Sequence, residues 1–256
     1  MYLARWRALS LIGCIWWISS ASLTEPAIAN ENAAEDLIAF AIEPWRPANP
    51  GIGLVRWPVQ PSVTLHFLAK NMSAEEAAAV EYVNDFRQKC SCISAVSVVT
   101  RGDRIERRQN DILILIDKNG FASFLDQTPE EIKTTFGTAS QLNENFPRTL
   151  PKSRSKTESS FRFLADREHV LAVTAVISVN EKLEGLRSVL AFNLLAGLNP
   201  ALAQSPDLIQ VYVKDAGTSG DEMKIPTPAA YDLLRHLFSS KIVPGMMPED
   251  VRRIEW

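Results

Sequence analysis

Two adjacent stretches decide the fold: residues 170–179 read VLAVTAVISV and residues 184–198 read EGLRSVLAFNLLAGL. The first is dense in β-branched residues and predicts a buried strand. The second predicts a helix that is apolar on nearly every side, through Leu186, Val189, Leu190, Phe192, Leu194, Leu195 and Leu198. Such a helix lies at the centre of a domain. We therefore expect a strand followed by a buried helix, with Gly197 ending that helix or allowing close packing.

Working outward, periodicity and turn residues predict further elements on both sides of this pair. Helices are expected at 32–42 and at 73–89. In the second, Ser73 is the cap, and the apolar stripe consists of Ala77, Val80, Val83 and Phe86. Two more helices are expected to begin at Thr128 and at Thr227, the latter with Pro228 in its first turn. Strands are expected at 54–57, 63–68, 94–99, 111–116 and 160–164, and a short strand or turn at 208–213. The order predicts a single α+β domain, a mixed sheet with packed helices, over residues 54–256. An N-terminal helix and a Pro-rich connector precede it at 30–53.

Composition excludes several classes of protein. The chain has 256 residues, a formal net charge of −3, 46% hydrophobic residues and 22% charged residues. These values are typical of a globular protein rather than a disordered or fibrous one. No basic excess marks a nucleic-acid partner, and none is expected. The four arginines within 101–109 are interpreted as a solvated hairpin or crossover, with an anion or partner patch as the alternative.

The first 29 residues have the pattern of a secretory signal. Arg5 and Arg7 precede an apolar run at 8–18, and Ala27-Ile28-Ala29 resembles a cleavage site. The run is too short for a transmembrane helix, so no membrane-spanning segment is expected after cleavage. This predicts a periplasmic or secreted protein. The alternative is a lipoprotein anchored through Cys14, since Leu11-Ile12-Gly13-Cys14 resembles a lipobox.

Linear motifs of catalysis are missing from the sequence. His66, His169 and His236 do not stand four residues apart, so no helix presents a zinc-binding pair, and each is interpreted as a surface or core residue. His66 alternates with apolar residues and is expected to point away from them. Asp166 and Glu168 flank Arg167 and are read as a solvated hairpin turn. The pattern predicts no catalytic, cofactor-binding or metal-ligating residue.

Cys90-Ser91-Cys92 is the one unusual local feature. In an oxidising compartment the two sulfurs could form a disulfide, which closes a small ring. Two other interpretations stay open: soft thiolate binding of a metal, and two buried small side chains at a turn between helix and strand.

The C-terminal third resembles an exported bacterial family of unknown function. The resemblance rests on Gly197-Leu198-Asn199, Thr227-Pro228, the stretch Leu234-Arg235-His236-Leu237-Phe238 and Pro244-Gly245-Met246. Members of that family look like zincin-type metallopeptidases, with an edge strand, a buried helix and a C-terminal segment like a met-turn. The resemblance covers roughly Leu54–Met246 and implies a zincin-like fold.

The departures from the family decide the functional prediction. Where the family's helix carries paired acidic residues and Gln, this chain has Leu190, Ala191 and Leu194, and a further acidic position reads Ala230. Apolar side chains can neither hold a metal nor take a proton from water. We therefore predict a non-catalytic, zincin-like binding or interaction protein of the bacterial cell envelope, a pseudoenzyme without a cofactor. Its partner would be a protein or another envelope component.

Two further expectations concern the site. Arg187, a polar residue on the central helix, is expected near the mouth of any remaining cleft. The alternative function is a metal-dependent, metallopeptidase-like hydrolase, in which His66, His169 and C-terminal carboxylates converge without a linear motif.

Overall fold

The computed structural model describes residues 32–47, 49–100, 110–118, 158–179, 183–204, 206–216 and 223–256. The expected signal segment with Cys14, the arginine-rich stretch 101–109 and the helix expected from Thr128 lie outside these ranges. Within them, no helix has both the length and the apolar character needed to cross a bilayer.

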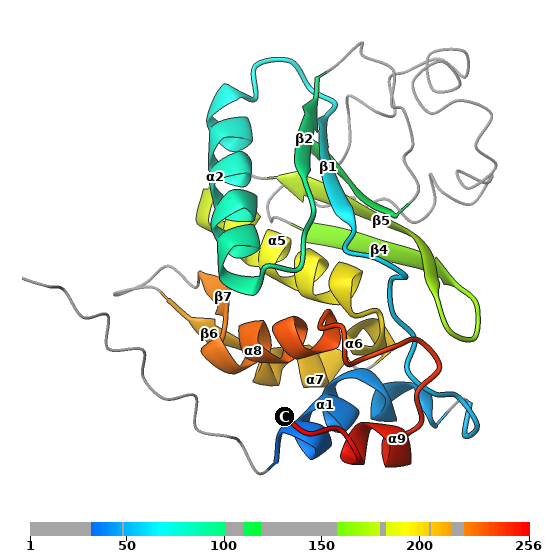
Figure 1. Ribbon diagram of the computed structural model, residues 1–256. Coiled ribbons are helices and arrows are strands. Elements are labelled where there is room, and N and C mark those ends of the chain that lie inside the picture. Colours follow the sequence, from blue (N-terminus) through cyan, green and yellow to red (C-terminus); the bar gives the residue numbers. More distant parts are fainter. Residues whose placement is uncertain are drawn as a thin grey trace, which may run out of the picture. The chain divides into compact units, whose positions relative to one another are not determined.

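A five-stranded mixed sheet forms the centre of the fold (Figure 1). Its strands are β1 (Ser62–Phe67), β2 (Val96–Val99), β3 (Asp111–Lys118), β4 (Glu158–Ala165) and β5 (Val170–Val179), in the order β2-β1-β3-β5-β4. The first four in that order are parallel, and β4 pairs antiparallel with β5 as an edge strand. The predicted mixed sheet with packed helices is confirmed. The predicted strand at 54–57 is wrong, because that segment makes only an isolated bridge between Arg56 and His169.

Strand β1 is buried on both faces, so of the two interpretations of His66, surface or core, the structure bears out the core one. All six residues of β1 are buried, and His66 itself is only 1% exposed. Alternation of polar and apolar residues is typical of a half-buried strand, but parallel strands inside a sheet are covered on both sides. His66 therefore belongs to the interior of the protein and not to its surface.

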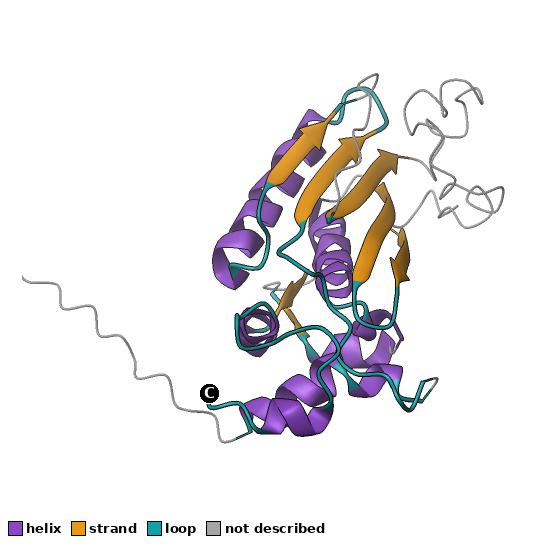
Figure 2. Cartoon of the chain, turned by 45° about the vertical axis from the view of Figure 1, so that its right-hand side comes forward, coloured by secondary structure: helices purple, strands orange, loops and turns teal. Residues whose placement is uncertain are grey.

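Two long helices, α2 (Ser73–Cys90) and α5 (Leu183–Leu198), cover one face of the sheet (Figure 2). Both were predicted. The buried stripe of α2 differs in part from the prediction: Ala77 is exposed, and Ala79 lies in the core with Val83 and Phe86. Ser73 is the first helical residue rather than the cap. In α5, a Cβ atom at Gly197 would lie 3.2 Å from the side chain of Ile112, so this glycine allows the helix to approach β3 closely.

Shorter elements complete the fold. They are α1 (Ala33–Ala41), a 3-10 turn η1 (Glu43–Trp45), α6 (Ala201–Gln204), α7 (Pro206–Val211), the hairpin β6 (Val213–Asp215) and β7 (Lys224–Pro226), α8 (Pro228–Leu237) and α9 (Pro248–Arg252). Thr227 caps α8 as predicted, since its hydroxyl accepts from the Ala230 amide. The strand or turn expected at 208–213 is wrong, because α7 occupies most of that stretch.

Candidate functional site: a groove beside the C-terminal turn

Helix α5 follows β5 directly and is enclosed by the core. Leu190, Ala191 and Leu194 are each 0% exposed, and they pack in the same apolar cluster as the sheet. Neither leucine nor alanine offers a lone pair to a metal or a base to water.

The polar side chains of α5 serve structural contacts. Arg187 pairs with Glu81 of α2 at 3.1 Å, so it joins two helices. It does not line the groove described below, and its expected place at a cleft mouth stays a prediction. The Ser188 hydroxyl accepts from the Lys224 amide at 2.8 Å, which ties α5 to β7. Asn193 donates to the Val189 carbonyl of its own helix at 2.7 Å.

The three histidines lie on three different elements. His66 is buried in β1, His169 follows the β4–β5 turn, and His236 sits on α8 with its ring edge-to-face against Trp256, at 4.8 Å between centroids. His169 has one carboxylate in reach, with Nδ1 3.6 Å from an Asp166 oxygen. Across the described ranges, no group of three His, Cys, Asp or Glu side chains is arranged to hold a metal ion. Among these residues, His66, His169 and carboxylates near the C-terminus therefore do not form such a group.

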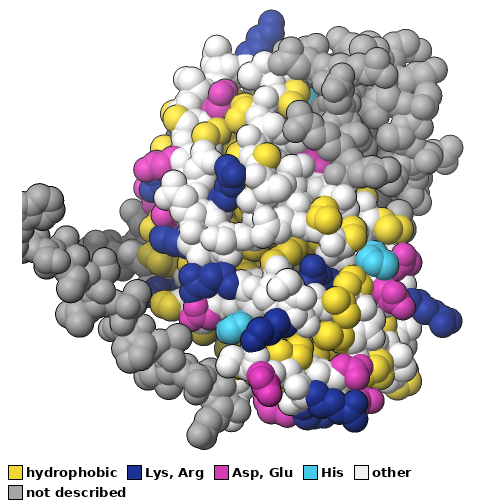
Figure 3. All heavy atoms as spheres, in the orientation of Figure 1, with side chains coloured by type: hydrophobic (Ala, Val, Ile, Leu, Met, Phe, Trp, Pro, Cys, Tyr) yellow, Lys and Arg dark blue, Asp and Glu magenta, His cyan; other side chains and the backbone are white. Residues whose placement is uncertain are grey.

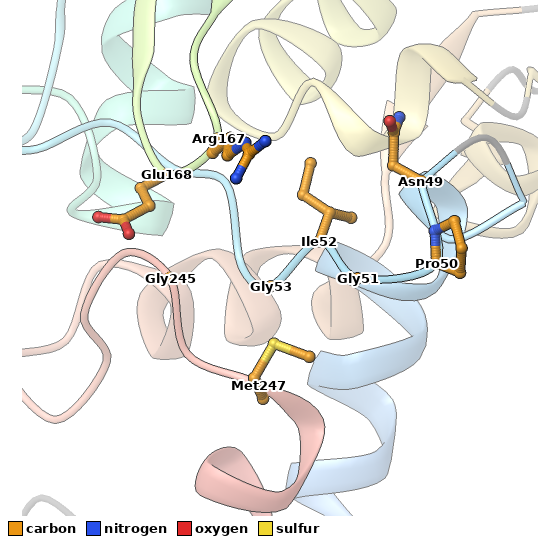
Figure 4. Close-up of a pocket in the computed structure, with 9 residues that line it drawn as sticks. All are labelled: Asn49, Pro50, Gly51, Ile52, Gly53, Arg167, Glu168, Gly245 and Met247. Carbon is orange, nitrogen blue, oxygen red and sulfur yellow. The ribbon is translucent and has the colours of Figure 1, made fainter.

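A groove with a volume of about 510 Å³ lies between the β4–β5 turn and the C-terminal turn (Figure 4). We call it the hairpin groove. Its floor is the segment Asn49–Gly53, and its sides are formed by Arg167 and Glu168 and by Gly245 and Met247. The two sides meet where the Glu168 carboxyl group lies against Gly245, since a Cβ atom there would stand 3.1 Å from the carboxyl carbon. Figure 4 shows Arg167 and Glu168 projecting from the β4–β5 turn, and Met247 on the other side of the floor segment. The met-turn-like motif of the sequence therefore borders the groove, whereas α5 contributes no residue to it.

Backbone hydrogen bonds hold the floor segment between the two turns. The Leu54 amide donates to the Met246 carbonyl at 2.8 Å, and the Gly245 amide donates to the Leu54 carbonyl at 2.8 Å. On the other side, the Arg56 amide donates to Glu168 at 3.1 Å. Gly53 lies so close to the C-terminal turn that a Cβ atom there would stand 2.5 Å from the Gly245 oxygen. Both walls of the groove are thus fixed to one short piece of chain.

The side chain of Arg56 anchors this piece of chain in the interior. It is 8% exposed and donates to the carbonyls of Leu237 and Ile242 at 2.6 and 2.8 Å, at the end of α8. Desolvation by burial lowers the pKa of this guanidinium, which nonetheless stays charged at neutral pH. The helix dipole favours a cation at this end of α8. The sequence offers one signal for the role of Arg56, its position between the apolar residues Val55 and Trp57.

The turn itself is ordered by Asp166. One oxygen of this carboxylate accepts from the amides of Glu168 and His169 at 2.8 and 2.6 Å. These two hydrogen bonds, with the first the larger contribution, lower the pKa of Asp166. The predicted hairpin turn is confirmed, and Arg167 and Glu168 are exposed at its tip. The hairpin groove thus presents a cation and a carboxylate side by side above a floor of backbone and small residues.

Cys90 and Cys92 are joined by a disulfide at the end of α2, and both are fully buried. Between them Ser91 adopts a left-handed conformation, with φ at 51°, and its amide donates to the Arg87 carbonyl. The bond lies at the point where α2 ends and the chain turns toward β2. In this arrangement the cysteines stabilise the end of a helix and do not line the hairpin groove.

Comparisons with protein-family models, with curated proteins and with solved structures found no match to this chain.

Proposed function

We propose that this chain is an exported, zincin-like protein that binds a partner through the hairpin groove and carries out no metal-dependent hydrolysis. The observation that carries the proposal is the burial of Leu190, Ala191 and Leu194, which fill the places of the resembled family's polar helix residues. A hydrolase of that kind needs ligands and a general base on this helix. In this chain the corresponding positions hold apolar residues that pack in the core, so the helix offers neither metal ligands nor a general base there.

The order of elements supports the zincin-like part of the proposal. An antiparallel edge strand, β4, is followed by β5, then by the buried helix α5, and the Pro244–Met246 turn comes near the C-terminus. The resembled family has the same succession of strand, buried helix and turn. The export signal that the sequence predicts at residues 1–29 supports the exported part of the proposal, in the periplasm or outside the cell.

The shape and charge of the hairpin groove support binding of an extended segment of a partner protein. The groove is open, its floor is a stretch of backbone, and its exposed wall offers one positive and one negative side chain, Arg167 and Glu168. Backbone hydrogen bonding gives affinity to an extended peptide, and flanking charges select its sequence. A partner segment with an acidic residue next to a basic one would complement this wall.

Metal analysis of the purified protein tests the non-catalytic part. We expect no stoichiometric zinc and no peptide hydrolysis that a chelator stops. The double variant His169→Ala, His236→Ala should leave the zinc content and the rate of peptide hydrolysis unchanged. Stoichiometric zinc together with chelator-sensitive hydrolysis would overturn the proposal in favour of the metallopeptidase-like alternative.

Site-specific photocrosslinking in cells tests the groove. A photoreactive residue at Gly51 stands on the open floor, where an added Cβ meets nothing within 4 Å, and the same residue at exposed Lys70 is the control. A crosslinked band is expected from Gly51 only, and the charge swap Arg167→Glu, Glu168→Arg should abolish it. A band of equal strength from Lys70, or one that the swap leaves unchanged, would remove the hairpin groove as the binding site.

A further inference from the structure

A second pocket, with a volume of about 370 Å³, lies among the end of α2, the β6–β7 hairpin and α8. Its charged lining consists of three cations from three segments: Lys89, Lys214 and Arg235. Its apolar lining includes Ile225, Pro226 and the ring of Tyr231. We call it the basic pocket. Figure 3 shows Lys and Arg side chains gathered over the lower end of α2 and the neighbouring hairpin, with apolar side chains among them.

The carboxylates near the basic pocket pair with its cations but do not line it. Lys89 lies 2.7 Å from Asp85, and both side chains are about half exposed at 52% and 50%. Arg235 pairs with Asp232, also with both side chains half exposed. Exposed pairs of this kind contribute little, so a ligand oxyanion can take the place of either carboxylate at low cost. Among the residues that the structure describes, the three lining cations and these two aspartates together carry a net charge of +1.

The geometry holds one cation and the aromatic ring in place before any ligand arrives. Arg235 donates to the Lys89 carbonyl at 3.2 Å, which fixes the guanidinium against the end of α2. The Tyr231 ring packs edge-to-face on Phe86 at 5.2 Å and lies 6.0 Å from the Lys89 ammonium. Burial, and secondly the charge of Asp85, raise the pKa of Tyr231, so its hydroxyl stays a neutral hydrogen-bond donor.

We propose that the basic pocket binds a small organic anion, a phosphate or carboxylate oxyanion attached to an apolar or aromatic group. The guanidinium of Arg235 suits two oxygens of such a group, while the two lysines act as point charges. The apolar part of the ligand covers Ile225, Pro226 and the face of Tyr231. This site is separate from the hairpin groove and does not depend on the function proposed for that groove.

Calorimetric titration of the full chain with phenyl phosphate tests the proposal. We expect saturable binding with a Kd of about 1 mM or lower, which weakens as salt is raised. Inorganic phosphate, which lacks the ring, should bind several-fold more weakly, and benzyl alcohol, which lacks the charge, should not bind. No saturation by phenyl phosphate up to about 20 mM would overturn the proposal.

Matched variants localise the binding. Lys214→Gln and Arg235→Gln should each weaken phenyl phosphate binding about tenfold, as expected for the loss of one charge-assisted contact. Lys70→Gln and Arg253→Gln remove the same charges at exposed positions elsewhere and should leave Kd unchanged. Lys214 is itself exposed, so its variant keeps the fold even if Arg235→Gln does not. Equal binding by wild type and Lys214→Gln, or equal weakening by the controls, would refute the basic pocket as the site.

Discussion

A Cβ atom at Gly53 would lie 2.5 Å from the carbonyl oxygen of Gly245 and 2.8 Å from that of Met246. The two glycines belong to segments almost two hundred residues apart in sequence, and both line the hairpin groove. Both obstructing atoms are backbone atoms, which cannot rotate out of the way as the end of a side chain could.

Gly53→Ala should therefore destabilise the protein. We expect a loss of about 1–3 kcal/mol in the free energy of unfolding, since the added methyl group forces two backbone segments apart. Gly51→Ala, two residues earlier, is the matched control and should change it by less than about 0.5 kcal/mol, because an added methyl group there meets nothing. Urea denaturation measures both. Equal stability of the two variants would contradict the close approach.

Trp57 lies at the other end of the same segment, fully buried, and its indole N–H donates to the Gly197 carbonyl at 2.7 Å. The last carbonyls of a helix have no partner within it, so Trp57→Phe leaves this one buried and unsatisfied. We expect the loss in unfolding free energy to exceed that of Trp45→Phe by about 1–3 kcal/mol. Trp45 is a fitting control because, within the described residues, its indole nitrogen has no hydrogen-bond partner. Thermal or urea denaturation of the two variants measures both losses. An equal loss of unfolding free energy in Trp45→Phe would contradict the role of this hydrogen bond.

Arg56→Met removes a buried cation while keeping most of the side-chain volume. We expect a loss of about 2–4 kcal/mol in the free energy of unfolding, because each buried carbonyl left without a partner costs about 1–3 kcal/mol. Arg252→Met is the control: its pair with Glu35 is exposed and screened by solvent, so its loss should change the free energy of unfolding much less. Guanidinium denaturation of both variants gives the comparison, and a smaller loss for Arg56→Met than for Arg252→Met would show that Arg56 does not hold α8.

His236 makes stability depend on pH. Burial, against the opposing charge of Asp232, lowers the pKa of this imidazole, and Arg235 and Lys241 lower it further. The unfolded chain therefore binds this proton more readily than the folded one, and stability falls as the pH drops through the ordinary histidine pKa of about 6.5. We expect the urea midpoint to fall between about pH 7 and pH 5, and to fall less in His236→Gln. An unchanged pH dependence in the variant would contradict this assignment.

The central strand and helix could be predicted from sequence because their patterns are local. Residues 170–179 and 184–198 need no distant information to be read as a buried strand and a buried helix. His66 could not be placed, since its alternating neighbours also fit a half-exposed strand, and its burial depends on what packs on each face of the sheet. The helix α7 was missed although Ser205-Pro206-Asp207 has the composition of a helix start.

The hairpin groove was beyond prediction for a different physical reason. Its walls come from the β4–β5 turn and the C-terminal turn, and Arg56 reaches a carbonyl 181 residues away in the chain. Such contacts depend on how elements pack, and no spacing within the sequence encodes them. The sequence did predict that Leu190, Ala191 and Leu194 of α5 cannot bind a metal or act as a base, because this follows from residue types alone.

The ion pair of Arg252 with Glu35 is one of several contacts that join α1 to segments synthesised late. Apart from the adjoining 3-10 turn, α1 packs on α6, α8 and α9. The side-chain amide of Asn199 also donates a hydrogen bond to the backbone carbonyl of Phe40, a fully buried residue of α1. All of these partners are translated in the last quarter of the chain. Until those residues have been synthesised, the apolar side of α1 lacks the surfaces that cover it in the folded protein, so α1 joins the core only at the end of synthesis.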